Sequence, residues 1–121
     1  MSRDHRKLQV FAMADAAVLE VYERTRAFPT DERFGLRSQL RRAAVSVPTN
    51  IVEGAARKST RDYLHFLTIA QGSASEARYL VSLSHRLGFL TASDLSVLEP
   101  TYGRVTRALQ GLVRSLEGLP P

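Results

Sequence analysis

Arginine is the residue type that most strongly favours a chemical role for this sequence, and it is concentrated in one stretch. Of the 17 basic residues only Lys7 and Lys58 are lysine. Between Arg33 and Arg61 there is a single acid, Glu53, so this segment carries +6 while the remaining residues sum to −1. A guanidinium group is a planar fork that fits phosphate or carboxylate. The segment therefore predicts either a surface that binds phosphates or a subunit interface rich in arginine–carboxylate pairs.

The basic residues of this stretch are the candidates for contact with a nucleic-acid backbone. They are Arg33, Arg37, Arg41, Arg57, Lys58 and Arg61. Such a cluster predicts non-specific phosphate binding that weakens as salt rises. Few aromatic residues accompany the charges, with Tyr63 as the nearest, so base stacking is not predicted. The alternative is that these side chains form an ordinary solvated surface and pair with nearby acids.

A second group of polar residues recurs at helical spacing through the same stretch. It comprises Gln39, Arg42, Ser46, Asn50 and Glu53, with Ser73 and Glu76 on the following helix. We expect a structural network, facing the third helix or a neighbouring subunit, in which Arg42 pairs with Glu53 or Glu76 and contributes specificity more than stability. Asn50 is placed to bond backbone carbonyls that Pro48 leaves free. A solvated helix face and a direct ligand-binding role are the alternatives.

The sequence lacks the patterns of catalytic and metal-binding sites. The histidines His5, His65 and His85 have no i,i+4 spacing, and there is no cysteine. Neither a GxxxxGK[ST] phosphate loop nor a GxSxG nucleophile elbow is present. We therefore predict a protein that is not an enzyme and needs no metal or cofactor. An enzymatic role would have to use Glu53 or Glu76 in a cleft.

Four helices are expected to position these residues. Apolar residues recur at intervals of three and four along four segments, and no segment shows the alternation of a strand. We predict helices at about residues 4–28, 31–57, 60–87 and 92–117 of a single domain, 1–121. Short connections make this an all-α, antiparallel up-down four-helix bundle. Helix two should be kinked at Pro48 rather than broken there, because its polar and apolar stripes resume in phase afterwards.

Local signals set the expected ends of the helices. Pro29 should end the first helix, and Thr30 or Asp31 should cap the second. Gly88 should end the third helix in a left-handed conformation. No apolar run approaches the length of a membrane span, and the N-terminal residues do not resemble a signal peptide. We therefore expect a cytoplasmic protein without a membrane partner.

Several short motifs of the central stretch occur together in a known family. They are Phe28-Pro29, Gly35-Leu36 with Gln39, Arg41-Arg42-Ala43 with Ser46, Pro48 with Asn50-Ile51, Glu53-Gly54, and then Gly72-Ser73 with Glu76. In order and spacing they resemble the four-helix-bundle proteins encoded in intervening sequences of bacterial 23S rRNA genes. The match covers about half of the chain. Phe11 stands where the family often has tryptophan.

The resemblance implies a homopentameric ring of four-helix bundles. Relatives of this family include accessory proteins of diversity-generating retroelements, whose basic surfaces bind nucleic acid and a reverse transcriptase. The leading hypothesis is thus a homo-oligomer that binds RNA or DNA as an accessory to an RNA or ribonucleoprotein assembly. Its protein partner would be a reverse transcriptase or a ribosomal component. The alternative hypothesis is a structural scaffold that contacts proteins and has no nucleic-acid role.

Overall fold

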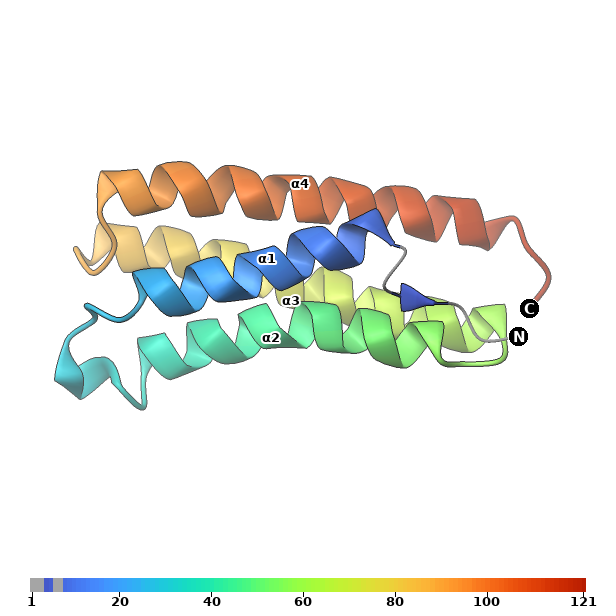
Figure 1. Cartoon of the computed structure of the whole chain (residues 1–121), viewed down its shortest axis with the longest axis horizontal. Coiled ribbons are helices and arrows are strands. Elements are labelled where there is room, and N and C mark those ends of the chain that lie inside the picture. Colours follow the sequence, from blue (N-terminus) through green and yellow to red (C-terminus); the bar gives the residue numbers. More distant parts are fainter. Residues whose placement is uncertain (1–3, 6–7) are drawn as a thin grey trace.

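A computed structural model of the protein describes residues 4–5 and 8–121. Its elements are α1 (Gln9–Arg24), the 3₁₀-helix η2 (Thr30–Glu32), α2 (Leu36–Ala55), α3 (Thr60–Arg86) and α4 (Ala92–Glu117). The four α-helices lie lengthwise beside one another (Figure 1). Among the described residues there is no strand, which confirms the predicted all-α class.

The connections alternate between the two ends of the bundle. The α1–α2 and α3–α4 connections lie at one end, and the α2–α3 turn lies at the other with the C-terminus (Figure 1). Each helix packs against its two neighbours in the order α1, α2, α3, α4 and back to α1. This arrangement is an antiparallel up-down bundle, as the short connections predicted. At the end with the C-terminus, the backbone N–H of Thr60 donates to the carbonyl oxygen of Pro121 at 3.0 Å.

The core is built from the apolar stripes of all four helices. Its fully buried side chains include Val21 of α1, Leu40 and Ile51 of α2, Leu67 of α3, and Leu98 and Leu109 of α4. Two tyrosines, Tyr63 and Tyr102, are buried among them. Burial raises the pKa of the Tyr102 phenol, so this side chain stays neutral at physiological pH.

Helix α2 continues through Pro48 without a break, as predicted. The proline ring is itself buried, so it adds apolar surface to the core at the position where it removes a backbone donor. The predicted kink at Pro48 stays a prediction.

Near the end of the same helix, Gly54 allows a close approach of α3. A Cβ atom at Gly54 would lie 2.9 Å from Cδ1 of Tyr63 and 3.0 Å from Cβ of Phe66.

The first helix is shorter than the predicted range of 4–28. It begins at Gln9 and ends at Arg24, well before Pro29; residues 6 and 7 of the predicted range lie outside the described residues. The helix ends before the proline is reached, at residues that make one local and one tertiary contact. The hydroxyl of Thr25 donates to the carbonyl of Val21 at 2.7 Å, and Phe28 then packs on Phe89 with ring centroids 5.5 Å apart.

The second helix also begins later than the predicted residue 31 and ends at Ala55 rather than 57. The predicted caps Thr30 and Asp31 belong instead to η2. The side chain of Glu32 supplies the first partner of α2, because its Oε1 accepts the backbone N–H of Leu36 at 2.9 Å. A carboxylate at this place is favoured by the helix dipole.

The third and fourth helices follow the predicted boundaries closely. Ser59 caps α3 by accepting the backbone N–H of Asp62 at 3.1 Å. Gly88 follows α3 with φ of 82°, the left-handed conformation predicted for it. Thr91 and Asp94 form a reciprocal capping box at the start of α4.

Asp94 joins this cap to α1. Its Oδ1 accepts a hydrogen bond from Nη1 of Arg24 at 2.9 Å, and Nε of Arg24 also pairs with Oε2 of Glu20, one turn earlier in α1, at 2.6 Å. Burial raises the pKa of Asp94, but the hydrogen bonds from Thr91 and Arg24 outweigh it, and the net pKa lies below the ordinary value. The ionised carboxylate is therefore the form that the fold stabilises.

We predict that Asp94→Ala lowers the free energy of unfolding by about 1–2 kcal/mol at neutral pH. Because the folded pKa is depressed, this contribution is present above the ordinary aspartate pKa and is lost as pH falls through the folded pKa. Urea unfolding at pH 7 and in a series of more acidic buffers measures the difference between variant and wild type. Asp62→Ala is the matched control, since Asp62 holds the same position in α3 and makes no ion pair with any described residue. A difference for Asp94→Ala that stays constant into strong acid would contradict this account.

No helix within residues 4–5 and 8–121 combines the length and the apolar character needed to cross a membrane.

Candidate nucleic-acid interface

The structure separates the six basic candidates into two groups at opposite ends of α2. Arg33, Arg37 and Arg41 lie at its N-terminal end, and the other group, Arg57–Arg61, surrounds the turn into α3. Helix α2 has 20 residues, so the two groups are about 30 Å apart. The sequence prediction of one basic surface is thus replaced by two smaller clusters, one at each end of the bundle.

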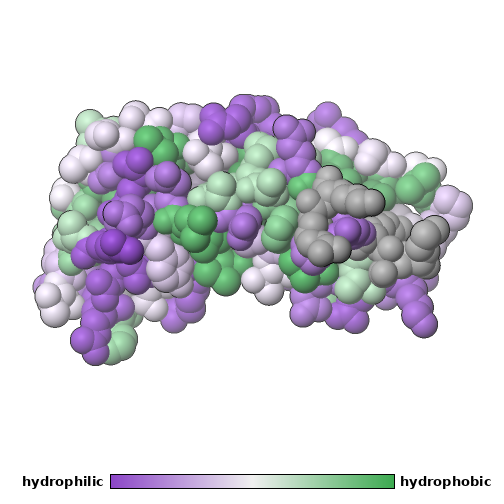
Figure 2. Space-filling model, viewed as in Figure 1, coloured by the Kyte–Doolittle hydropathy of each residue, from purple (hydrophilic) through white to green (hydrophobic). Residues whose placement is uncertain are grey.

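At the first end, Arg33 and Arg37 are without acidic partners. Neither makes an ion pair with any residue that the structure describes. The guanidinium of Arg33 lies 4.7 Å from the ring centroid of the neighbouring Phe34. Figure 2 shows hydrophilic residues gathered over the end of the molecule that carries the α1–α2 connection. Unpaired guanidinium groups at an exposed end are available to bind phosphates.

Arg41 has a different role from its two neighbours. Its Nε donates to the hydroxyl of Thr25 at 2.8 Å, and its Nη2 donates to the carbonyl of Tyr22 at 3.1 Å. The same guanidinium lies 4.4 Å from the centroid of the Tyr22 ring. These contacts bind the C-terminal turn of α1, where carbonyls lack helical partners and favour a positive charge. Arg41 therefore links α1 to α2, and its guanidinium is not a candidate for phosphate binding.

We predict that Arg41→Ala lowers the free energy of unfolding by about 1–3 kcal/mol, because it leaves Thr25 and the Tyr22 carbonyl without this donor. Arg41→Lys should recover only part of the loss, since a single ammonium cannot reproduce the planar fork. Arg37→Ala, one turn away and without an ion-pair partner in the described chain, should change the stability by less than about 0.5 kcal/mol. Unfolding curves in guanidinium chloride compare the free energies of unfolding of the three variants. Equal effects of Arg41→Ala and Arg37→Ala would show that Arg41 is only a surface charge.

At the second end, one of the three cations, Arg57, forms an ion pair with Glu53. Nη2 of Arg57 lies 3.1 Å from Oε2 of Glu53, and its guanidinium lies 4.6 Å from the centroid of Phe66. Lys58 and Arg61 are exposed and make no ion pair with described residues. The predicted pairing of Arg42 with Glu53 does not occur within the chain, where Glu53 pairs with Arg57 of the following turn instead.

The polar residues that recur along α2 have a half-buried part and an exposed part, and we call them the polar stripe: Gln39, Arg42, Ser46, Asn50 and Glu53. The hydroxyls of Ser46 and Ser73 share a hydrogen bond of 2.8 Å between α2 and α3. Nδ2 of Asn50 donates to the carbonyl and to the hydroxyl of Ser46, at 2.8 and 3.0 Å. The prediction for Asn50 is a bond to backbone carbonyls that Pro48 leaves free, and the structure gives the Ser46 carbonyl. These three residues form a polar contact between helices, which is the structural role predicted for them.

The exposed part of the stripe lies on the outside of the bundle. We call it the outer α2–α3 face, and it comprises Gln39, Arg42, Val45, Thr49 and Glu53 of α2 with Ile69, Gly72 and Glu76 of α3. Arg42 and Glu76 make no ion pair with described residues, so their predicted pairing within the chain is wrong. Val45 and Ile69 are 38% and 39% exposed, which adds apolar area to this face.

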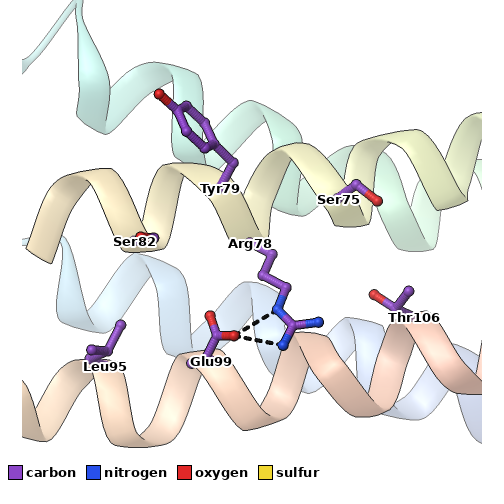
Figure 3. Close-up of a pocket in the computed structure, with 7 residues that line it drawn as sticks. All are labelled: Ser75, Arg78, Tyr79, Ser82, Leu95, Glu99 and Thr106. Atoms are coloured by element: carbon purple, nitrogen blue, oxygen red, sulfur yellow. Dashed lines mark hydrogen bonds and ion pairs between the residues drawn. The ribbon is translucent and has the colours of Figure 1, made fainter.

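Two of the surface grooves lie between neighbouring helices. The larger one, of about 480 Å³, lies between α3 and α4 and is lined by Ser75, Arg78, Tyr79, Ser82, Leu95, Glu99 and Thr106 (Figure 3). Its two charged side chains neutralise each other, since Nε and Nη2 of Arg78 both lie 2.7 Å from Oε1 of Glu99. Glu53 and Glu76, the only acids considered for catalysis, do not line this groove. Among the described residues there is also no cluster of three or more potential metal ligands.

A comparison with protein families identifies the chain. The family model of the 23S rRNA-intervening sequence protein matches residues 6–111. The chain belongs to this family. In this member of the 23S rRNA-intervening sequence protein family, the motif residues Ser46, Asn50 and Gly54 lie at the contact between α2 and α3, so their role is structural. The basic residues at the two ends of α2 lie outside that contact.

A solved structure has the same fold. It is a protein of unknown function from the S23 ribosomal protein family of Bacteroides thetaiotaomicron, with a TM-score of 0.80 and 19% sequence identity. The alignment covers 87% of this chain and 98% of that one. At this identity the likeness establishes the four-helix arrangement alone. No curated protein matches the chain.

The main residue that sequence reasoning overlooked is Phe34. Tyr63 was named as the aromatic neighbour of the basic residues, but Tyr63 is 1% exposed and serves the core. Phe34 is 83% exposed and directly follows Arg33. The available signal was its position, because Phe34 lies outside the apolar stripe that begins at Leu36.

Proposed function

We propose that the protein is a non-enzymatic homo-oligomer, a pentamer, that binds the backbone of RNA or DNA in the cytoplasm. It would act as an accessory to an RNA or ribonucleoprotein assembly. The single observation that supports this proposal most is the pair of unpaired basic clusters, Arg33 with Arg37 and Lys58 with Arg61, at opposite ends of α2. Cations without acidic partners retain their full charge for phosphates.

The spacing of the clusters favours an extended polyanion over a small anion. A duplex rises 3.4 Å per base pair, so the distance of about 30 Å between the ends corresponds to about nine base pairs. A nucleic acid of that length or longer can contact both ends of one chain. In a ring the clusters would repeat with the symmetry and give a larger positive surface.

The homo-oligomer is supported by the outer α2–α3 face. Arg42 and Glu76 are of opposite charge, lie on neighbouring helices and have no ion pair in the described chain. The exposed Val45 and Ile69 beside them provide apolar contact area. A face that is mixed in charge and partly apolar suits contact with another copy of the chain.

The same face supports a second candidate function, a scaffold that contacts proteins without binding nucleic acid. In that case Arg42→Glu and Glu76→Arg should each disrupt assembly, and their combination should restore it. The scaffold hypothesis further requires that RNA does not bind to the assembled protein. Light scattering of the three variants measures assembly independently of nucleic acid.

The test of the nucleic-acid function is a titration of a fluorescently labelled 20-nucleotide RNA with the intact protein in about 50 mM salt, followed by anisotropy. Light scattering on the same sample gives the mass of the assembly. The proposal expects an oligomer that raises the anisotropy. An assembled protein that leaves the anisotropy unchanged would support the scaffold, and a monomer would contradict the oligomeric part of the proposal.

A further inference from the structure

Phe34 presents an aromatic ring to solvent near the end of the α1–α2 connection, two residues before α2 begins. It is 83% exposed, more than any other large apolar residue described. The guanidinium of Arg33 lies 4.7 Å from its ring centroid, within the range of a cation–π contact. At such exposure the ring retains surface for a second planar group.

The chain on both sides of this ring is held by the fold. Before it, Phe28 is 5% exposed and packs on Phe89. After it, Leu36 is 8% exposed, and Glu32 bonds its backbone N–H at 2.9 Å. The backbone N–H of Gly35 also donates to the carbonyl of Glu32 at 3.1 Å. An exposed ring on an anchored connection loses little conformational entropy when it binds, so it is suited to recognition.

The charges beside the ring indicate the class of ligand. Arg33 and Arg37 make no ion pair with described residues, and both lie within three positions of Phe34. Cations that contact phosphates, next to an aromatic face that stacks on a base, are the pattern by which proteins bind single strands. A duplex offers only phosphates here, because its bases are stacked within the helix.

We infer that Phe34 stacks on a nucleobase of single-stranded RNA or DNA while Arg33 and Arg37 bind the adjoining phosphates. This inference rests on the proposed nucleic-acid function and names the form of nucleic acid that this end of the bundle takes. A contact between Phe34 and a second protein is the competing explanation, and it would be seen as an effect of Phe34 on assembly.

The absence of tryptophan from the sequence allows a direct test. Phe34→Trp places one fluorophore at the proposed stack. Its emission should be quenched by a single-stranded oligouridylate and unchanged by an abasic oligonucleotide of equal length, which offers phosphates without bases. Equal quenching by the abasic strand, or none by the oligouridylate that still binds, would overturn the stacking while leaving the proposed function intact. If neither strand binds at all in anisotropy, the proposed function itself fails.

The affinities of substituted proteins complete the test. Phe34→Ala should weaken binding of the single strand by about 5- to 150-fold and that of a duplex much less. Phe34→Leu should resemble Phe34→Ala, since it keeps the apolar volume but loses the flat face. Leu19→Ala is the matched control, because Leu19 is an exposed apolar side chain (69%) on α1 and belongs to neither basic cluster. Unchanged affinity of Phe34→Ala, or a change in assembly mass with unchanged affinity, would overturn the inference.

Discussion

Reversing the charge of Arg33, Arg37, Lys58 and Arg61 together should weaken RNA binding by about 30- to 1,000-fold. An exposed ion pair contributes up to about 1 kcal/mol, and each reversal also replaces attraction by repulsion. The two double variants, one for each end, should each account for part of the loss. Anisotropy titrations in one low-salt buffer measure all three.

The stability of the fold should be little affected by these changes, because the four side chains have no ion pair to lose among the described residues. The matched control is Arg104→Glu with Arg107→Glu. Both are exposed arginines of α4, and the pair changes the net charge as much as either double variant does. The control should weaken binding by less than about tenfold, through the general field alone. Equal losses for the control and for either end would contradict a localised interface.

Replacing Gly54 by valine should lower the free energy of unfolding by about 3 kcal/mol or more. A Cβ atom there would meet Cδ1 of Tyr63 at 2.9 Å and the backbone oxygen of Tyr63 at 3.2 Å. The tyrosine is buried and cannot move aside, so α2 and α3 would have to separate, which costs about 1–3 kcal/mol for overpacking before the γ-methyl groups are added. Thermal and urea unfolding measure the loss.

Gly72 of α3 provides the opposite control. A Cβ atom at Gly72 would meet nothing within 4 Å, so Gly72→Ala should stabilise the protein by about 0.5–1 kcal/mol through helix propensity. A Gly54→Val protein as stable as the wild type would show that α2 and α3 lie farther apart than the distances of 2.9–3.2 Å from a Cβ atom at Gly54 to Tyr63 imply. It would also remove the structural explanation of the motif around Ser46, Asn50 and Gly54.

The helices could be predicted because their apolar residues recur at a helical period, and the caps at Ser59, Thr91 and Gly88 are local signals. The connection between residues 25 and 35 could not. Its path depends on Arg41 reaching Thr25 and on Phe28 meeting Phe89, contacts between residues far apart in sequence. The predicted boundaries at 28 and 31 relied on a proline and on cap residues whose local preferences these contacts override.

The same distinction applies to the candidate site. Net charge marked residues 33–61 as an unusually basic segment, but spacing within a sequence does not reveal partners. Glu53 pairs with Arg57 rather than with Arg42, and Arg41 binds α1. Ser46 and Ser73 meet as predicted because both lie on helix faces that must pack. The remaining unpaired cations follow from the structure, and they are fewer and more widely separated than the sequence suggested.

The salt dependence of RNA binding tests the central proposal most directly. With at least four phosphate contacts, the logarithm of the binding constant should fall with the logarithm of salt concentration at a slope of about −3 or steeper for a single strand. The wild-type protein should show this slope, and the four-residue variant should lose most of it. Binding with a slope near zero, or a slope that the variant retains in full, would contradict a phosphate interface at the ends of α2.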